Sequence, residues 1–345
     1  MSTQATLSSS ADVPSSVVVR NLATSYALSQ AVYVVAKLGI ADLLADGPKD
    51  RATLAAATET HAPSLYRVLR LLTTVGVFAE REDGLFELTP AGDCLRTAPG
   101  SMRLPVTVWG SEWVYRPFGD LLYSVKTGAP AFDHIYGMGF FPYLAQNPEA
   151  GRNFNEGLTD LFLQQRAAVA KAYDFSGFHK IVDVGGGYGA LVTTILKGNP
   201  HLHGVLFDQP SVVEGGKNQI EAAGVADRCE AVAGNFFEAV PPGGDLYCLS
   251  LVIHDWDDDR SLTILKNCHR AMEKGGKLLL VEVLVGVRNE PDWGKLTDAY
   301  MLVLTRGGRE RTVAEYGDLF AAAGFRLTTT IATQSEMSII EGVRV

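Results

Sequence analysis

The segment Lys-Ile-Val-Asp-Val-Gly-Gly-Gly-Tyr-Gly at 180–189 constrains the fold more than any other part of the sequence. Ile181 to Val184 is an apolar run broken only by Asp183, and glycines follow it, so we predict a buried strand that ends in a tight turn. A helix is expected from Ala190 to Leu196. Glycines at such a turn let the backbone approach a ligand closely, and the first N–H groups of the helix are free to bind it. The segment is therefore typical of a nucleotide-cofactor loop.

The spacing of the glycines indicates which cofactor the turn holds. Gly185, Gly187 and Gly189 form G-x-G-x-G. A dinucleotide fingerprint requires G-x-G-x-x-G, and here Ala190 stands where its third glycine would be. This register, with Asp183 just before the turn, favours S-adenosylmethionine (SAM) over a pyrophosphate. An ordinary strand-to-helix turn is the alternative interpretation of the glycines alone.

Strands and helices alternate after the turn. Further strands are predicted at 204–207, 229–233, 246–251 and 277–284, with helices at 211–223 and 259–272. This alternation predicts a parallel, doubly wound sheet, which binds ligands at the carboxyl edge of its strands. Gly185, Asp208, Asn235 and His254 all fall on that edge. Asp208 follows the turn by about 20 residues, where an acidic side chain can accept both ribose hydroxyls.

Five motifs in this half of the chain resemble those of a known family. They are Asp-Val-Gly-Gly-Gly-Tyr-Gly (183–189), Phe-Asp-Gln-Pro (207–210), Gly-Asn-Phe-Phe (234–237), Ile-His-Asp-Trp-Asp-Asp (253–258) and Gly-Gly-Arg-Glu-Arg-Thr (307–312). The family is that of the SAM-dependent O-methyltransferases of plant phenolic type. Its bacterial branch, with phenazine, mitomycin, anthracycline and hydroxyneurosporene methyltransferases, is the closer likeness. The resemblance spans roughly residues 17–345.

The resemblance implies an α/β fold in which a Rossmann-like class I methyltransferase domain follows an N-terminal, mainly helical, winged-helix dimerisation domain. We expect four parts: a disordered tail at 1–16, the winged-helix domain at 17–100, a helical connector and acceptor-pocket segment at 101–175, and the SAM-binding domain at 176–345. The tail has neither the basic start nor the apolar core of a signal peptide. We therefore expect a cytoplasmic protein with no membrane partner.

The pattern before residue 100 itself predicts a winged helix. A helix at 21–38 with a wide apolar stripe is followed by helices at 51–58 and 63–74. The turn Glu82-Asp83-Gly84 then joins two short strands into a hairpin. A stripe so apolar near a terminus suggests burial against another subunit, and the resemblance implies a homodimer formed through this domain.

A winged helix also raises a remote alternative, a DNA-binding regulator. Its second helix carries Arg67 and Arg70, which could contact phosphates. The same helix is largely apolar, however, and the chain has a net charge of −9 and a pI near 5.3. Phosphate binding demands a basic face. We therefore expect no nucleic-acid partner.

Large aromatic side chains crowd residues 101–175. Core packing accounts for most of them, but in the resembled family this segment lines the acceptor pocket, opposite a wall just before Gly307. The acceptor-contacting residues expected on this basis are Trp109, Met138, Phe141, Phe154, Asn155, Tyr300, Met301 and Leu304. A pocket lined in this way favours a flat aromatic acceptor, such as a secondary metabolite.

His254 lies where a catalytic base is needed. A phenol with a pKa near 10 is mostly un-ionised at neutral pH, and an imidazole with an ordinary pKa near 6.5 can remove its proton as the oxygen attacks. The resemblance implies that Glu282 and Glu310 flank the histidine and that Asp255 contacts the acceptor. The acidic run at 257–259 is interpreted as a helix start, where carboxylates favour the positive end of the dipole.

The cofactor-binding residues expected from the edge positions and from the resemblance are Asp183, Gly185, Gly187, Asp208, Asn235, Phe236, Ser250 and Trp256. Two of them depart from the family pattern. Asn235 stands where an aspartate usually accepts from the adenine amino group, and Ser250 where the plant enzymes have a lysine. An amide oxygen still accepts, more weakly than a carboxylate.

A metal is not expected. The acidic run could suggest Mg²⁺, as in small catechol methyltransferases, but those lack a winged helix, and this chain supplies a histidine base instead. The four cysteines are far apart, without a C-x-x-C pair. The resemblance implies an enzyme that transfers the methyl group of SAM to a hydroxyl of an aromatic or polyketide-type secondary metabolite. The alternative is a non-methylating family member that holds SAM while acting as a hydroxylase or pericyclase, and formation of S-adenosylhomocysteine would separate the two.

Overall fold

A computed structural model describes residues 13–345 and divides the chain into two compact units, with the boundary between Ser111 and Glu112. None of the helices within the described residues is both long and apolar enough to cross a membrane.

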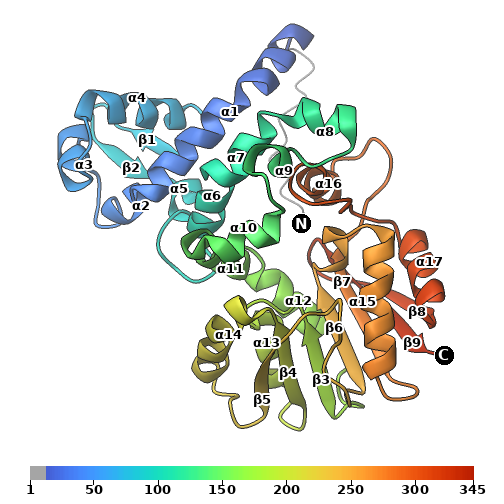
Figure 1. Ribbon diagram of the computed structural model, residues 1–345. Helices are drawn as coiled ribbons and strands as arrows, with labels where there is room; N and C mark the ends of the chain where they lie inside the picture. Colours follow the sequence, from blue (N-terminus) through green and yellow to red (C-terminus); the bar gives the residue numbers. More distant parts are fainter. Residues whose placement is uncertain (1–12) are drawn as a thin grey trace. The chain divides into compact units, whose positions relative to one another are not determined.

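The first unit has the predicted order of helices followed by a hairpin (Figure 1). Its elements are α1 (Ser15–Lys37), α2 (Ile40–Leu43), α3 (Arg51–Ala57), α4 (Ala62–Thr73), β1 (Phe78–Glu80), β2 (Phe86–Leu88), α5 (Pro90–Asp93) and α6 (Arg103–Trp109). β1 and β2 pair antiparallel. Leu65, Leu69 and Leu72 recur at helical spacing on α4 and are buried against the other elements of this unit.

Helix α1 begins earlier than the sequence predicted. Ser15 and Ser16 belong to the helix, so their assignment to a disordered tail was wrong, and the rest of the predicted tail up to residue 12 lies outside the described residues. The apolar stripe divides into two halves. Ala31 and Val35 are buried within the unit, whereas Leu22 is 54% exposed. Val18, Val19 and Tyr26 are exposed as well.

The second unit begins with a run of helices that precedes its sheet. These are α7 (Glu112–Phe118), α8 (Leu121–Thr127), α9 (Ala131–Tyr136), α10 (Phe140–Gln146), α11 (Pro148–Leu161) and α12 (Leu163–Ala172). Aromatic rings join them, because Phe132 contacts Phe140 edge-on at 5.3 Å and Phe140 contacts Phe154 at the same centroid distance. Such edge-to-face contacts stabilise the packing beyond the area they bury.

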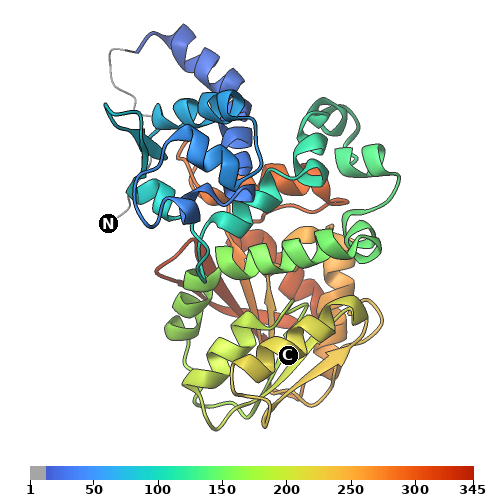
Figure 2. The same cartoon turned by 90° about the vertical axis from the view of Figure 1, so that its left-hand side faces the viewer.

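A seven-stranded sheet in the order β5-β4-β3-β6-β7-β9-β8 forms the centre of this unit (Figures 1 and 2). Its strands are β3 (Lys180–Val184), β4 (His203–Asp208), β5 (Cys229–Ala233), β6 (Leu246–Ser250), β7 (Lys277–Val283), β8 (Phe325–Ala332) and β9 (Met337–Arg344). The five strands β3 to β7 are parallel, as predicted. The sequence analysis did not predict β8 and β9, which add an antiparallel edge to the sheet, because β9 pairs antiparallel with both β7 and β8.

Helices cover both faces of the sheet. They are α13 (Ala190–Gly198), α14 (Pro210–Ala222), α15 (Asp258–Ala271), α16 (Trp293–Leu304) and α17 (Val313–Ala323), and a short 3-10 turn, η1 (Ile253–Asp255), follows β6. Side chains alternate along each strand. Val182 therefore packs with residues of α15 and α17, whereas its neighbour Ile181 packs with residues of α12 and α13. Because both faces of the sheet are covered, side chains on both sides of these strands are buried, and the strands are nearly continuous apolar runs.

Candidate active site

The glycine turn after β3 has the backbone that a cofactor loop requires. Gly185, Gly187 and Gly189 have φ angles of +70°, +60° and +77°, a region that side chains rarely adopt. A Cβ atom at Gly185 would lie 2.9 Å from Val252 Cγ2, so a larger residue would displace the loop that leads to His254. Gly189 is the N-cap residue of α13.

Asp183 lies behind this turn. Its side chain is 1% exposed, and neither carboxylate oxygen has a hydrogen-bond partner among the described residues. A Cβ atom at Gly186 would lie 2.6 Å from Asp183 Oδ2, so the carboxylate supports the turn from within. Burial raises the pKa of this carboxyl to about 7. Asp183 therefore packs against the cofactor loop from within, and its contact with the cofactor stays a prediction.

Asp208 ends the neighbouring strand and is tied to the same turn. Its Oδ2 atom accepts a hydrogen bond from the Gly187 N–H at 2.8 Å, and its Oδ1 atom accepts from the Gln209 N–H at 2.7 Å. Burial raises the pKa of this carboxyl to about 6, although the two N–H groups act to lower it. Asp208 therefore joins the glycine turn to the end of β4, where the sequence predicted a ribose contact.

The remaining predicted cofactor residues lie at the ends of β5 and β6. The Asn235 side chain is exposed and folds onto its own turn, because its Oδ1 atom accepts from the Phe237 N–H at 3.0 Å. The ring centroids of Phe236 and Trp256 are 6.0 Å apart. Ser250 Oγ is buried without a partner in the described part of the chain, so it remains able to bond a ligand.

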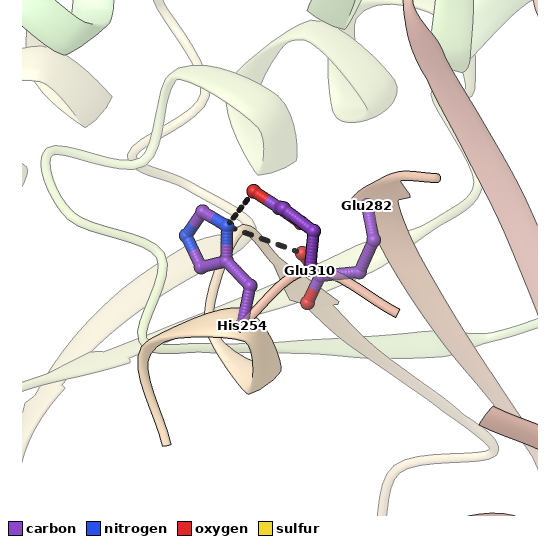
Figure 3. Close-up of side chains that lie close together, drawn as sticks. All are labelled: His254, Glu282 and Glu310. Carbon is purple, nitrogen blue, oxygen red and sulfur yellow. Dashed lines mark hydrogen bonds and ion pairs between the residues drawn. The ribbon is translucent and has the colours of Figure 1, made fainter. Parts of the chain in front are cut away.

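His254, Glu310 and Glu282 converge, although they come from three different parts of the chain (Figure 3). His254 lies on η1, Glu282 on β7, and Glu310 in the loop before α17. The His254 Nδ1 atom is 2.9 Å from Glu310 Oε1 and 3.9 Å from Glu282 Oε2. The other ring nitrogen, Nε2, points away from both glutamates in Figure 3 and lies 3.7 Å from Asp255 Oδ1.

Electrostatics make this histidine a stronger base than an ordinary imidazole. Burial tends to lower the pKa of His254, but neighbouring carboxylates outweigh it and raise the pKa to about 10. The carboxylates are those of Glu310, Asp255 and Glu282. Burial in turn raises the pKa of Asp255 to about 6 and that of Glu282 to about 7, against the lowering effect of His254. The pKa near 6.5 assumed from the sequence is therefore too low.

Arg311 holds the turn that carries His254, a role that the sequence analysis missed. The guanidinium is fully buried and donates to the carbonyl oxygens of Ile253 at 2.9 Å and Trp256 at 2.8 Å. It also donates to Asp258 Oδ1 at 2.7 Å. Asp258 therefore does more than begin a helix, whereas Asp257 does cap α15 by accepting from the Arg260 N–H at 2.8 Å.

Gly308 brings the following loop directly against the same turn. The Arg309 N–H donates to the His254 carbonyl oxygen at 2.8 Å. A Cβ atom at Gly308 would lie 2.7 Å from that oxygen, which is shorter than real Cβ contacts. The Gly-Gly-Arg-Glu-Arg-Thr motif thus contributes a closely packed glycine, a carboxylate and a guanidinium to the turn that carries His254. The motif was visible in the sequence, but only Glu310 was taken from it as a site residue.

The predicted acceptor-side residues are partly brought together. Phe141 stacks on Trp256 with centroids 5.6 Å apart, and Tyr300 contacts Phe118 at 4.7 Å. Asn155 instead lies beside the cofactor turn, because its Oδ1 atom would be 3.6 Å from a Cβ atom at Gly187. Phe154 packs on Trp113 and Phe140, Leu304 is buried, and Met138 and Met301 are half-buried. Trp109 belongs to the first unit, on α6.

The fold and the edge residues together define a SAM-dependent methyltransferase. A family profile for an O-methyltransferase domain matches residues 118–326, and a profile for an O-methyltransferase dimerisation domain matches residues 20–98. The chain belongs to this O-methyltransferase family. It is 48% identical to a phenazine O-methyltransferase of Lysobacter antibioticus over 95% of this chain and 96% of that protein. It is 32% identical to a phenazine-1-carboxylate N-methyltransferase of Pseudomonas aeruginosa, over 92% and 93%.

Solved structures agree with this assignment. The crystal structure of LaPhzM matches with a TM-score of 0.93 and 47% identity, over 96% of this chain and 100% of that chain. An O-methyltransferase from neocarzinostatin biosynthesis matches with a TM-score of 0.81 and 33% identity, over 92% and 96%, and was solved with SAM and 2-hydroxy-5-methyl naphthoic acid. The cofactor of this enzyme is SAM, and the enzyme acts in secondary metabolism.

Proposed function

We propose that the enzyme transfers the methyl group of SAM to a hydroxyl of a polycyclic aromatic metabolite, with His254 as the general base. The observation that carries this proposal is the pairing of His254 Nδ1 with Glu310 at 2.9 Å, which leaves Nε2 directed away from both glutamates. A carboxylate on one ring nitrogen orients the imidazole and stabilises its protonated form. In the neutral form of the imidazole, the other nitrogen is then available to take a proton.

The protein supplies the proton transfer and the alignment. The glycine turn, Asp208 and Ser250 would hold SAM, which would supply an electrophilic methyl group on a sulfonium that leaves as a neutral thioether. Because the pKa of His254 is about 10, it nearly matches that of a phenol. The raised pKa of His254 therefore favours proton transfer from the phenol to the neutral imidazole. The Glu310 carboxylate then stabilises the imidazolium that forms.

The proposal is tested by measuring S-adenosylhomocysteine formation with two matched acceptors, a hydroxyphenazine and the corresponding aminophenazine. We expect faster formation with the hydroxyl compound.

An aromatic nitrogen is the second candidate acceptor, because one relative is an N-methyltransferase. A metal ion is a further possibility to test, because His254, Glu282 and Glu310 each offer one ligand atom and these atoms lie within 4.8 Å of one another. The assay therefore includes EDTA, and loss of activity on chelation would favour a metal.

Asp208→Ala is expected to weaken SAM binding by about 1.5–3 kcal/mol, the contribution of hydrogen bonds to a charged group. Asp208→Asn keeps one acceptor oxygen and should lose less. Because the pKa of Asp208 is about 6 and the ionised carboxylate is the better acceptor, SAM affinity should also fall as the pH drops through 6. Titration calorimetry measures both effects. Unchanged affinity in Asp208→Ala would place the ribose elsewhere.

A homodimer is expected to form through the dimerisation domain. In a single chain, Val18, Val19, Leu22 and Tyr26 expose apolar side chains along the first half of α1, and such a row is stabilised by burial against a second copy. Light scattering should report twice the chain mass of 37.1 kDa. Leu22→Asp should shift the protein to monomers without unfolding it, because Leu22 is 54% exposed in one chain. A monomeric wild type at micromolar concentration would contradict this expectation.

A further inference from the structure

The main chain of Glu310 is tied to the helix that carries predicted acceptor residues. The Glu310 N–H donates to Asp298 Oδ1 at 2.9 Å. Asp298 lies on α16, which also carries Tyr300, Met301 and Leu304. Asp298 comes twelve residues before Glu310 in the chain. The hydrogen bond therefore joins the acceptor-side helix to the partner of the catalytic histidine.

The Glu310 side chain has few hydrogen-bond partners. The Oε1 atom contacts His254, but the Oε2 atom is buried and accepts no hydrogen bond from the described residues. The flanking residues are held separately. Arg309 donates its N–H to the His254 carbonyl oxygen at 2.8 Å, and Arg311 pairs with the end of β7 through Leu284. Between Arg309 and Arg311, the Glu310 main chain is held by the hydrogen bond from its N–H to the Asp298 carboxylate.

We propose that Asp298 is a positioning residue for methyl transfer, which holds Glu310 in place against His254 by accepting the Glu310 N–H. This inference rests on the proposed function of His254 as the base. Asp298 acts on the histidine through Glu310. Its loss should displace the Glu310 carboxylate, and a misplacement of about 1 Å at a catalytic group can cost about 10²-fold in rate.

The hydrogen bond requires an acceptor oxygen and not a negative charge, which separates two variants. Asp298→Asn retains an amide oxygen for the Glu310 N–H, whereas Asp298→Ala removes the acceptor. The charged and titratable groups around the pair are Asp255 beside His254, Glu282 on β7, Arg311 in the same loop and Tyr316 on α17. All of these stay in place in both variants, so a difference between the variants reports the position of Glu310.

The experiment compares Asp298→Ala, Asp298→Asn and a control, Asp292→Ala. Asp292 lies at the start of α16, where it accepts from the Lys295 N–H at 2.8 Å, so its loss weakens the helix without touching Glu310. With SAM and a hydroxyphenazine, we expect kcat to fall about 10- to 100-fold in Asp298→Ala. KM for SAM should stay within about twofold. Asp298→Asn and Asp292→Ala should stay near wild type.

An NMR titration of the His254 imidazole provides a readout that does not depend on turnover. In Asp298→Ala the Glu310 carboxylate moves away, so the pKa of His254 should fall toward the ordinary value, while Asp298→Asn should keep it raised. If Asp298→Ala matches the Asp292→Ala control in both kcat and the His254 titration, the positioning role is overturned. Failure of the proposed function would show differently, because His254→Ala would then retain full activity.

Discussion

His254→Ala is expected to lower kcat about 10²- to 10⁴-fold, the range for losing a positioned general base, while the affinity for SAM stays nearly intact. The affinity should persist because the glycine turn and Asp208 lie at the ends of other strands and make their own contacts. A fall in kcat without a change in cofactor binding identifies an interaction made only in the transition state. Stopped-flow or steady-state turnover with a hydroxyphenazine, combined with calorimetry for SAM, measures both quantities.

The pH dependence of the rate reflects the ionisation of both His254 and the acceptor hydroxyl. Because carboxylates raise the pKa of His254 to about 10, the neutral, basic form becomes abundant only as the pH rises toward that value. The rate of the wild type should therefore keep rising well above pH 7. A free phenol ionises near the same pH, so the wild-type profile alone cannot assign the rising limb.

Glu310→Gln resolves this ambiguity. It removes one carboxylate that raises the pKa of His254, so the rising limb should move to lower pH, while the maximal rate falls less than in His254→Ala. In the double variant His254→Ala/Glu310→Gln, the profile should match that of His254→Ala. Full methylation activity in His254→Ala across this pH range would show that alignment alone drives the transfer and that His254 is not the base.

Gly308→Ala is expected to reduce kcat about 10²-fold, the effect of displacing a catalytic group by about 1 Å. The added methyl group would lie 2.7 Å from the His254 carbonyl oxygen and 2.8 Å from the Asp255 carbonyl carbon. The backbone of η1 must therefore shift, and His254 must shift with it. Cofactor affinity should change little, because the clash lies at the catalytic turn.

Gly317→Ala is the matched control for this substitution. Gly317 lies within α17, where an added methyl group would make only an ordinary contact of 3.6 Å with Leu327. Alanine is favoured over glycine inside a helix by about 0.5–1 kcal/mol, so this variant should be active and slightly more resistant to heat. Equal activity in Gly308→Ala and Gly317→Ala would show that the close approach at Gly308 does not position His254.

The strands that frame the site could be predicted from sequence because each is a short apolar run that ends at a polar or glycine residue. The strand Cys229–Ala233 was predicted to the residue. The antiparallel pair β8 and β9 was missed. Its edge strand β8 alternates buried and exposed residues only at Phe325 to Leu327 and is then largely exposed, so it lacks the continuous apolar signal of the buried strands.

The proposed catalytic residues His254, Glu282 and Glu310 were expected from a family resemblance, whereas the contacts that hold them depend on the tertiary structure. The bond from Arg311 to the Ile253 carbonyl spans 58 residues, and only the folded chain shows it. The surroundings of Asp183 likewise became clear only in the structure. Its place in the motif predicts a cofactor contact, which stays a prediction, whereas its burial behind Gly186 is seen only in the folded chain. Sequence spacing alone does not show what surrounds the Asp183 side chain.

The central claim is tested most directly by the identity of the product. The purified enzyme is incubated with SAM carrying a ¹³C-labelled methyl group and a phenazine that offers both a hydroxyl and ring nitrogens, and the product is analysed by ¹³C NMR. The proposed function predicts a labelled methoxy carbon in equal amount to S-adenosylhomocysteine. A labelled N-methyl carbon, or a product formed without S-adenosylhomocysteine, would contradict it.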